Sequence, residues 1–171
     1  MTYGQIGMTQ ATAAFYTYFC ILMFHGFMPG DLIGQRIPWD DKNVYLKDSY
    51  GQSWDYESRV TLLNEARTGY FVSIVITQMI DLIMCKTRKN SIFQQGMGNW
   101  SLNFSIVFEV ILTCILLYVP GMERVTKTVP LDYYWFLPCL PFGILLWVYD
   151  ELRRWWIRTH PGGFIDRETY Y

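Results

Sequence analysis

Four long, predominantly apolar runs constrain this chain more than any other feature of its sequence. They cover residues 6–27, 69–85, 100–119 and 133–149, and about 20 apolar residues in a helix are enough to cross a bilayer. Tyrosine and tryptophan gather near the ends of the later runs, as they do at membrane–water interfaces. Core helices of a soluble protein would show a polar face at helical spacing, which these runs lack. The sequence therefore predicts an all-α, polytopic membrane protein with four transmembrane helices.

The composition agrees with a membrane protein and argues against one class of partner. Aromatic residues make up 18% of the 171 residues and only 17% are charged, while the mean hydropathy is +0.11. This combination is unusual in soluble domains. The net charge of −1 and the lack of a basic stripe argue against nucleic-acid binding. All four cysteines lie inside apolar runs, which favours packing over a disulfide framework.

Basic residues set the expected orientation, because short cytoplasmic loops carry an excess of lysine and arginine. Residues 86–99 include Lys86, Arg88 and Lys89, whereas residues 28–68 carry five basic against seven acidic residues. We therefore expect an extracellular loop at 28–68, a cytoplasmic tail at 150–171, and both ends of the chain in the cytoplasm. No charged residue precedes Asp31, so the first helix lacks a basic flank, and we expect the chain to be part of a longer protein.

Two of the runs place a carboxylate in a stripe of polar side chains. Inserting a charged carboxylate near the bilayer centre costs at least about 2.5 kcal/mol. Asp81 lies three residues after Gln78, and Glu109 lies at the middle of the third run. Each acid belongs to a series spaced by four residues, which forms one slowly drifting stripe on a helix. The series are Ser73, Thr77, Asp81 and Cys85, and Ser101, Ser105, Glu109 and Thr113.

Two interpretations of these acids stay open at this point. The hydroxyl and carboxyl groups could bond across neighbouring helices and act only as packing contacts. They could also line a pathway for a cation or a proton, and carboxylates inside a membrane are functional-site candidates by default. The pathway is the favoured interpretation, but two acids and several hydroxyl groups do not identify the ion. Nothing in the sequence predicts a resident metal beyond such a pathway.

Several long strings resemble one family in order and in spacing. They are "FVSIVITQMIDLIMCKTRKNSIFQQGM", "LLYVPGM", "VYDELRR" and "PGGFIDRETYY", and they are similar to the catalytic α-subunit of the sodium/potassium-transporting P-type ATPases and their proton/potassium relatives. The resemblance covers essentially the whole chain and implies the last four of the family's ten membrane helices. It also implies that ATP and Mg²⁺ act in the full-length pump, because the phosphorylation and nucleotide-binding domains precede this region. No catalytic residue or cofactor is therefore expected within these residues.

The resemblance assigns the cation pathway to three residues. Gln78 and Asp81 are similar to eighth-helix residues near the sodium-specific third site, and Glu109 to a ninth-helix glutamate that lines the same region. Val75 and Glu109 favour the sodium type, whereas the string "PFGILLWVYDE" is closer to the proton-pump branch. The resemblance therefore implies Na⁺ and K⁺, or H⁺, as the transported ions, and the subtype stays open. Ala13 and Ala14 replace a glycine pair typical of the seventh helix, which favours a regular helix there.

Three further sites follow from the resemblance. The string "SYGQ" (Ser49, Tyr50, Gly51 and Gln52) implies binding of the pump's β-subunit, although alone it predicts only an exposed turn. The terminal Tyr170 and Tyr171 resemble the family's C-terminal plug, for which Arg88 is a suitable partner. Ser91 follows two basic residues and is a possible phosphorylation site. A frayed tail and an ordinary basic membrane flank are the simpler alternatives.

The favoured function is the C-terminal transmembrane part of a sodium/potassium-exchanging P-type ATPase α-subunit in the plasma membrane, in contact with lipid and a β-subunit. It would contribute to the cation pathway, to β-subunit binding and to C-terminal gating. The alternative is a free-standing four-helix membrane protein that binds β-subunits or regulates pumps without transporting ions. The uncharged start of the chain favours the first of these.

Overall fold

The computed structural model describes residues 2–85, 98, 100–121 and 126–160. Most of this part is helical, and two very short strands form an antiparallel hairpin in which Leu46 pairs with Trp54. The elements, in chain order, are α1 (Thr2–Phe24), α2 (Arg36–Asp40), β1 (Leu46–Lys47), β2 (Ser53–Trp54), α3 (Tyr56–Cys85), α5 (Trp100–Tyr118), the 3-10 helix η1 (Tyr133–Phe136) and α7 (Leu140–Thr159).

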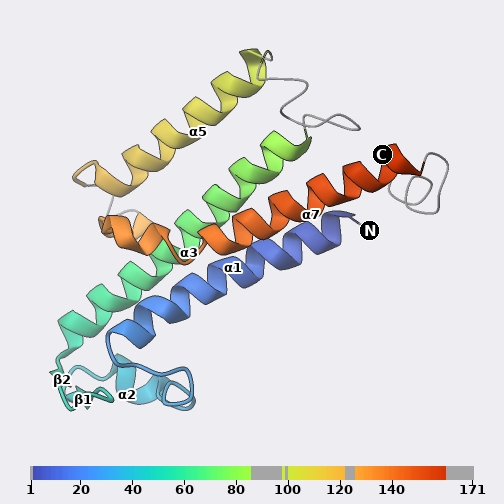
Figure 1. The fold of residues 1–171 in the computed structure, drawn as a ribbon. Helices are drawn as coiled ribbons and strands as arrows, with labels where there is room; N and C mark the ends of the chain where they lie inside the picture. The colour runs from blue at the N-terminus through green and yellow to red at the C-terminus, as the bar shows by residue number, and fades with distance from the viewer. Residues whose placement is uncertain (1, 86–97, 99, 122–125, 161–171) are drawn as a thin grey trace.

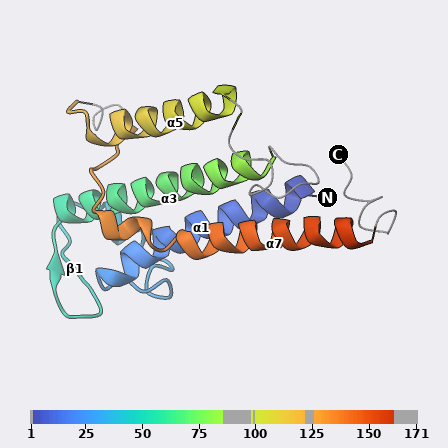
Figure 2. The ribbon, with the colours of Figure 1, turned by 45° about the horizontal axis from the view of Figure 1, so that its top comes forward.

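Helices α1, α3 and α7 lie side by side, and α5 runs along the outer side of α3 (Figure 1, Figure 2). The hairpin and α2 lie together at one end of the bundle. The N-terminus of α1 and the C-terminus of α7 lie at the opposite end (Figure 1). The loop of residues 28–55 is therefore separated from the start of α1 and the end of α7 by the length of the helices.

Three of the four expected spans are helices long and apolar enough to cross a membrane: Tyr56–Cys85, Trp100–Tyr118 and Tyr133–Thr159. Among the residues that the structure describes, α1 does not meet the same test of hydropathy, although it has 23 residues and no charged side chain. Uncharged polar and glycine residues in its first half, such as Gln5, Gly7 and Gln10, lower its hydropathy. The expected count of four is thus supported for three helices.

Two of these helices are longer than the apolar runs that predicted them. Helix α3 begins at Tyr56, 13 residues before the run, and its 30 residues extend for about 45 Å, against about 30 Å for the hydrocarbon core. Helix α7 continues to Thr159, ten residues past the run. Pro141 lies in its first turn, where a missing N–H costs no hydrogen bond. Both helices therefore extend polar turns beyond the expected membrane region.

Small residues let the helices approach closely, as is common in membrane bundles. A Cβ atom on Gly69 of α3 would lie 2.4 Å from Cδ1 of Ile21 in α1, and one on Gly143 of α7 would lie 2.4 Å from Cδ1 of Ile80 in α3. Ala13 and Ala14 are fully buried within α1, which stays regular from Thr2 to Phe24. The apolar core then continues into the hairpin end through Phe27 and Trp39.

Candidate functional site

The polar stripe on α3 begins as a packing contact with α1. The hydroxyl of Ser73 donates to that of Thr17 at 2.7 Å, and Thr17 in turn donates to the carbonyl of Ala13 at 3.0 Å. Thr77 donates to the carbonyl of Ser73 at 2.8 Å. Because Thr17, Ser73 and Thr77 are almost completely buried and their hydroxyls are satisfied inside the bundle, this part of the stripe holds the two helices together.

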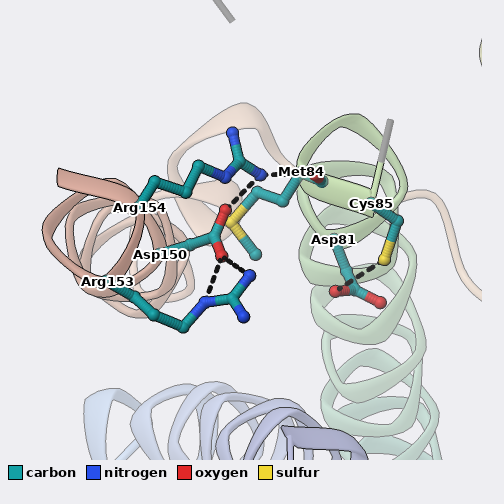
Figure 3. A network of polar contacts seen from close by, with 6 residues as sticks. All are labelled: Asp81, Met84, Cys85, Asp150, Arg153 and Arg154. Atoms are coloured by element: carbon teal, nitrogen blue, oxygen red, sulfur yellow. Dashed lines mark hydrogen bonds and ion pairs between the residues drawn. The ribbon is translucent and has the colours of Figure 1, made fainter. Parts of the chain in front are cut away.

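The stripe turns away from α1 before it reaches Asp81. This aspartate is half-buried and Gln78 is exposed, so the two expected pathway residues of α3 lie at the edge of the helix contact. The thiol of Cys85 donates to Oδ1 of Asp81 at 3.8 Å (Figure 3). The carboxylate thus has a weak neutral donor on its own helix.

Helix α7 adds a charged network beside this end of α3 (Figure 3). Asp150 is paired with Arg153, at 3.0 Å between Oδ1 and Nη2, and with Arg154 through its other oxygen. Arg154 also donates to the carbonyl of Met84 in the last turn of α3, where helix carbonyls lack a partner within the helix. Only 1% of Arg154 is exposed. The buried guanidinium therefore ties α7 to the turn that follows Asp81.

Sequence reasoning missed this network because residues 150–159 were expected to belong to a cytoplasmic tail. The local signal was present: Asp150 and Arg154 are separated by four residues, the spacing at which opposite charges pair on a helix. Nothing local, however, indicated that the pair would be buried against Met84. Helix α7 has to pack against α3 before that contact exists.

Glu109 is not brought to the other two expected pathway residues. It is half-buried on α5, and among the described residues it makes no hydrogen bond or ion pair with Gln78 or Asp81. Ser105, four residues earlier in the same stripe, donates back to the carbonyl of Ser101 at 3.0 Å. In the part of the chain that the structure describes, no group of three or more His, Cys, Asp or Glu side chains is arranged to hold a metal ion.

The "SYGQ" string forms the turn of the hairpin, and the preceding Asp48 organises it. Asp48 accepts hydrogen bonds from the backbone N–H groups of Tyr50 at 3.0 Å and Gln52 at 2.8 Å, and from the indole of Trp54 at 3.0 Å. Burial raises the pKa of Asp48, but hydrogen bonds from Trp54, Gln52, Tyr50 and Gly51 outweigh it and hold the pKa below its ordinary value. The charged carboxylate therefore stabilises the turn at neutral pH.

The end of α1 fixes where this turn lies. The N–H of Ser49 donates to the carbonyl of Gly26 at 3.0 Å, and its hydroxyl donates to Asp31 at 3.1 Å. Gly26 has φ of 90°, and a Cβ atom there would lie 2.8 Å from the ring of Tyr50. Tyr50 itself is 66% exposed. The turn is thus rigidly mounted and presents an aromatic side chain outward.

A fully buried arginine holds the rest of the loop. Arg59, in the first turn of α3, donates to the carbonyls of Pro38 at 2.6 Å, Asp41 at 2.8 Å and Val44 at 2.9 Å. These three carbonyls come from α2 and the segment that leads to β1. The positive charge of the guanidinium strengthens each hydrogen bond, so one side chain fixes the fold of the loop around the hairpin.

Four expected site residues lie outside the described part of the chain: Arg88, Ser91, Tyr170 and Tyr171. The gate that the sequence suggested for Arg88 and the two tyrosines, and the phosphorylation of Ser91, therefore stay predictions.

Comparison with known proteins agrees with the expected family. The family model described as "Cation transporting ATPase, C-terminus" matches residues 1–156. Over 172 aligned residues, which cover 100% of this chain, the sequence is 52% identical to the sodium/potassium-transporting ATPase subunit alpha of Drosophila melanogaster and 51% identical to subunit alpha-4 of Homo sapiens. The subunit alpha of Hydra vulgaris is 49% identical over the same length. The chain spans 16–17% of the length of these relatives.

Proposed function

This chain belongs to the cation-transporting ATPase family defined by its C-terminal region, and we propose that it forms the C-terminal membrane portion of a sodium/potassium-exchanging α-subunit. The observation that carries the proposal is 49–52% identity along the full length of the chain to subunits with that name. These relatives favour the sodium/potassium type over the proton/potassium type. ATP and Mg²⁺ would act elsewhere in such a pump, and its location would be the plasma membrane with both ends of this chain in the cytoplasm.

Helix α1 serves as the fourth span in this proposal. It carries no charge over 23 residues, a length that is sufficient to cross the bilayer. It also packs along α3, with Gly69 and the buried Ala13 and Ala14 in the region of contact. With α1 in the membrane, α2 and the hairpin lie on the outer side, and the ends of α3 and α7 that carry Asp81 and Arg154 lie on the cytoplasmic side.

Asp81 is the centre of the proposed cation route. Its half-buried carboxylate lies near the cytoplasmic end of α3, with Gln78 three residues before it. The Asp150–Arg154 pair beside it supports the route by fixing the position of the helix turn after Asp81. Glu109 would join the same route through an ion or through other helices of the pump, because it makes no hydrogen bond or ion pair to Asp81 among the described residues.

The hairpin turn is the proposed contact for the β-subunit. Tyr50 is exposed at 66%, while Asp48 and Gly26 hold the turn that carries it. An aromatic side chain on a rigid mount suits partner binding, because little conformational entropy is lost when the partner docks. At the other end, Tyr170 and Tyr171 would close near Arg88 and affect sodium affinity, and Ser91 would be open to phosphorylation.

The substitution Asp81→Asn in the full-length pump tests the cation route. Asparagine keeps the shape of the side chain but removes its charge. We therefore expect the sodium activation curve of phosphorylation to shift to concentrations about fivefold higher, which corresponds to about 1 kcal/mol of apparent sodium-binding free energy. Potassium affinity should change less. Glu57→Gln, an exposed acid-to-amide change in the first turn of the same helix, is the matched control. An unshifted curve in a normally assembled Asp81→Asn pump would mean that the aspartate serves packing.

The second candidate, a free-standing four-helix protein that binds β-subunits or regulates pumps, is tested by the size of the native polypeptide. An antibody raised against the tail "PGGFIDRETYY" should detect a band several times larger than 20.3 kDa if the chain is part of a pump. A single band near 20.3 kDa would support the free-standing protein and contradict the proposed pump.

A further inference from the structure

A cavity of about 480 Å³ lies between α1, α2 and α3, away from the residues proposed for ion transport and for β-subunit contact. Its volume is within the range of small-molecule sites, which is about 300–1,000 Å³. One wall is apolar and aromatic and includes Phe19, Leu22, Trp39 and Leu63. A ligand that fits this cavity must therefore have a hydrocarbon part.

The rim of the cavity is charged. Arg36 and Asp40 come from α2, and Arg67 comes from α3. Arg36 and Asp40 are four residues apart on one helix, a spacing that permits an ion pair. Among the described residues, however, no ion pair or hydrogen bond joins them, and Arg67 has no carboxylate partner. Two cationic groups and one anionic group thus remain at the mouth of an apolar cavity.

The height of this rim in the proposed membrane arrangement matches that of lipid headgroups. Arg67 lies two residues before the apolar run that begins at Gly69, and Leu22 lies two residues before the end of α1 at Phe24. Helix α2 lies beyond the ends of α1 and α3, at the hairpin end of the bundle (Figure 1). Arg36 and Asp40 on α2, and Arg67 just before the apolar run of α3, therefore lie at the height of the headgroup layer of the outer leaflet, while Phe19, five residues before the end of α1, lies deeper.

We propose that this cavity binds one glycerophospholipid of the outer leaflet through an amine-bearing headgroup. Arg36 and Arg67 hold the phosphate, since guanidinium groups match phosphate oxygens in geometry and charge. Asp40 faces the ammonium group, and the first carbons of an acyl chain lie against Phe19 and Leu22. This inference rests on the proposed function for its membrane orientation. Free inorganic phosphate could bind the two arginines as the lipid phosphate does, but it has no hydrocarbon part to contact the apolar wall.

The test uses the purified full-length pump, stripped of lipid and examined by native mass spectrometry. Phosphatidylethanolamine, phosphatidylglycerol with the same acyl chains, and inorganic phosphate are added separately. The wild-type pump should retain phosphatidylethanolamine best. The double variant Arg36→Gln/Arg67→Gln should bind both lipids about tenfold more weakly, as expected for lost charge-assisted hydrogen bonds. Asp40→Asn should lose only the preference for the amine, about threefold for an exposed group.

Lys47→Gln removes an exposed cation on β1, outside the cavity, and should retain lipid as the wild type does. Arg67→Gln alone keeps α2 intact and replaces the double variant if that protein is not monodisperse. Equal lipid retention in the arginine variants and the wild type, or binding of inorganic phosphate as tight as that of lipid, would overturn the proposal. Sodium-dependent phosphorylation of the wild type is measured in parallel, so a failure of the pump function is distinguished from a failure of this site.

Discussion

The two ends of α3 are each fixed by a buried arginine, and the two arginines differ in their partners. At the outer end, Arg59 is fully buried and binds three loop carbonyls together with the carbonyl of Asp55. At the end that we propose to be cytoplasmic, Arg154 of α7 is also buried, but it binds the carboxylate of Asp150 and one carbonyl of α3. The hydrogen bonds of the outer arginine go to neutral carbonyls, whereas the inner arginine also binds a carboxylate.

This difference in partners indicates the role of each end of α3. A cation whose hydrogen bonds go to carbonyls fixes the path of a loop without holding a buried carboxylate. A cation that binds a carboxylate keeps a buried negative charge close to the helix turn that carries Asp81, and that arrangement depends on both charges remaining in place. The outer end is therefore a rigid mount for the hairpin, whereas the inner end is an electrostatic network beside the proposed cation route.

The largest expected effect is at the outer end. Arg59→Met leaves three carbonyls without their donor, which should favour opening of the loop by about 3 kcal/mol. Trypsin added from outside should then cleave at the exposed Lys42 and Lys47 about a hundredfold faster, when cleavage follows the population of the open form. Arg59→Lys keeps the charge but not the fork of donors, and should give an intermediate rate. Equal cleavage in all three proteins would show that the loop is held by other contacts.

At the inner end, Arg154→Met leaves the buried Asp150, among the described residues, with Arg153 as its remaining ion-pair partner. We expect the full-length pump to lose about 2 kcal/mol of stability, measured as a lower temperature of inactivation in detergent. The double variant Asp150→Asn/Arg154→Met should recover part of this loss, because it also removes the buried negative charge that has lost its buried cationic partner. Arg158→Met, an exposed arginine in the last turn of α7, is the control. If the double variant were less stable than the single one, the network would not be the source of the effect.

A smaller effect is expected where α1 meets the hairpin. Gly26→Ala places a side chain at φ of 90°, with its Cβ atom 2.8 Å from the ring of Tyr50, at a cost of about 1–2 kcal/mol. The turn should shift, and less β-subunit should co-purify with the pump. Gly30→Ala, in the same loop with no atom within 4 Å of its Cβ position, should have no effect. Wild-type co-purification of the Gly26→Ala pump would separate β-subunit binding from the position of this turn.

The smallest effect is the dependence of the hairpin on pH. The folded pKa of Asp48 is below its ordinary value, so its stabilising effect is complete above the unfolded pKa of about 3.9 and is lost as pH falls through the folded pKa. Hydrogen exchange of the Tyr50 and Gln52 amides, corrected for the intrinsic rate, should report more opening below about pH 4. Asp48→Asn should be less protected at neutral pH and show little change with pH. If the Asp48→Asn variant showed an equally steep pH dependence, a titratable group other than Asp48 would be its cause.

The sequence by itself determined the class of the protein and the candidates for its site. Hydropathy along the chain predicted the membrane helices, because the cost of placing polar groups in hydrocarbon acts residue by residue, and the basic loops predicted their orientation. Three of the predicted spans are helices that satisfy the requirement for crossing a membrane. The four-residue spacing around Asp81 and the family strings identified the carboxylates and the hairpin turn. These features depend on residues that are near one another in the sequence, so they can be recognised without knowledge of the tertiary structure.

The tertiary structure alone decided which polar groups meet. Ser73 and Thr77 belong to the same stripe as Asp81, yet they are buried against α1 while Asp81 lies at its edge. The burial of Arg154 against Met84 connects residues 70 positions apart in sequence, and the three carbonyls that bind Arg59 come from a distant loop. Such contacts depend on which faces of the helices pack together. The close approaches at Gly69 and Gly143 belong to these packed faces, and no local pattern around Arg154 or Arg59 could indicate them.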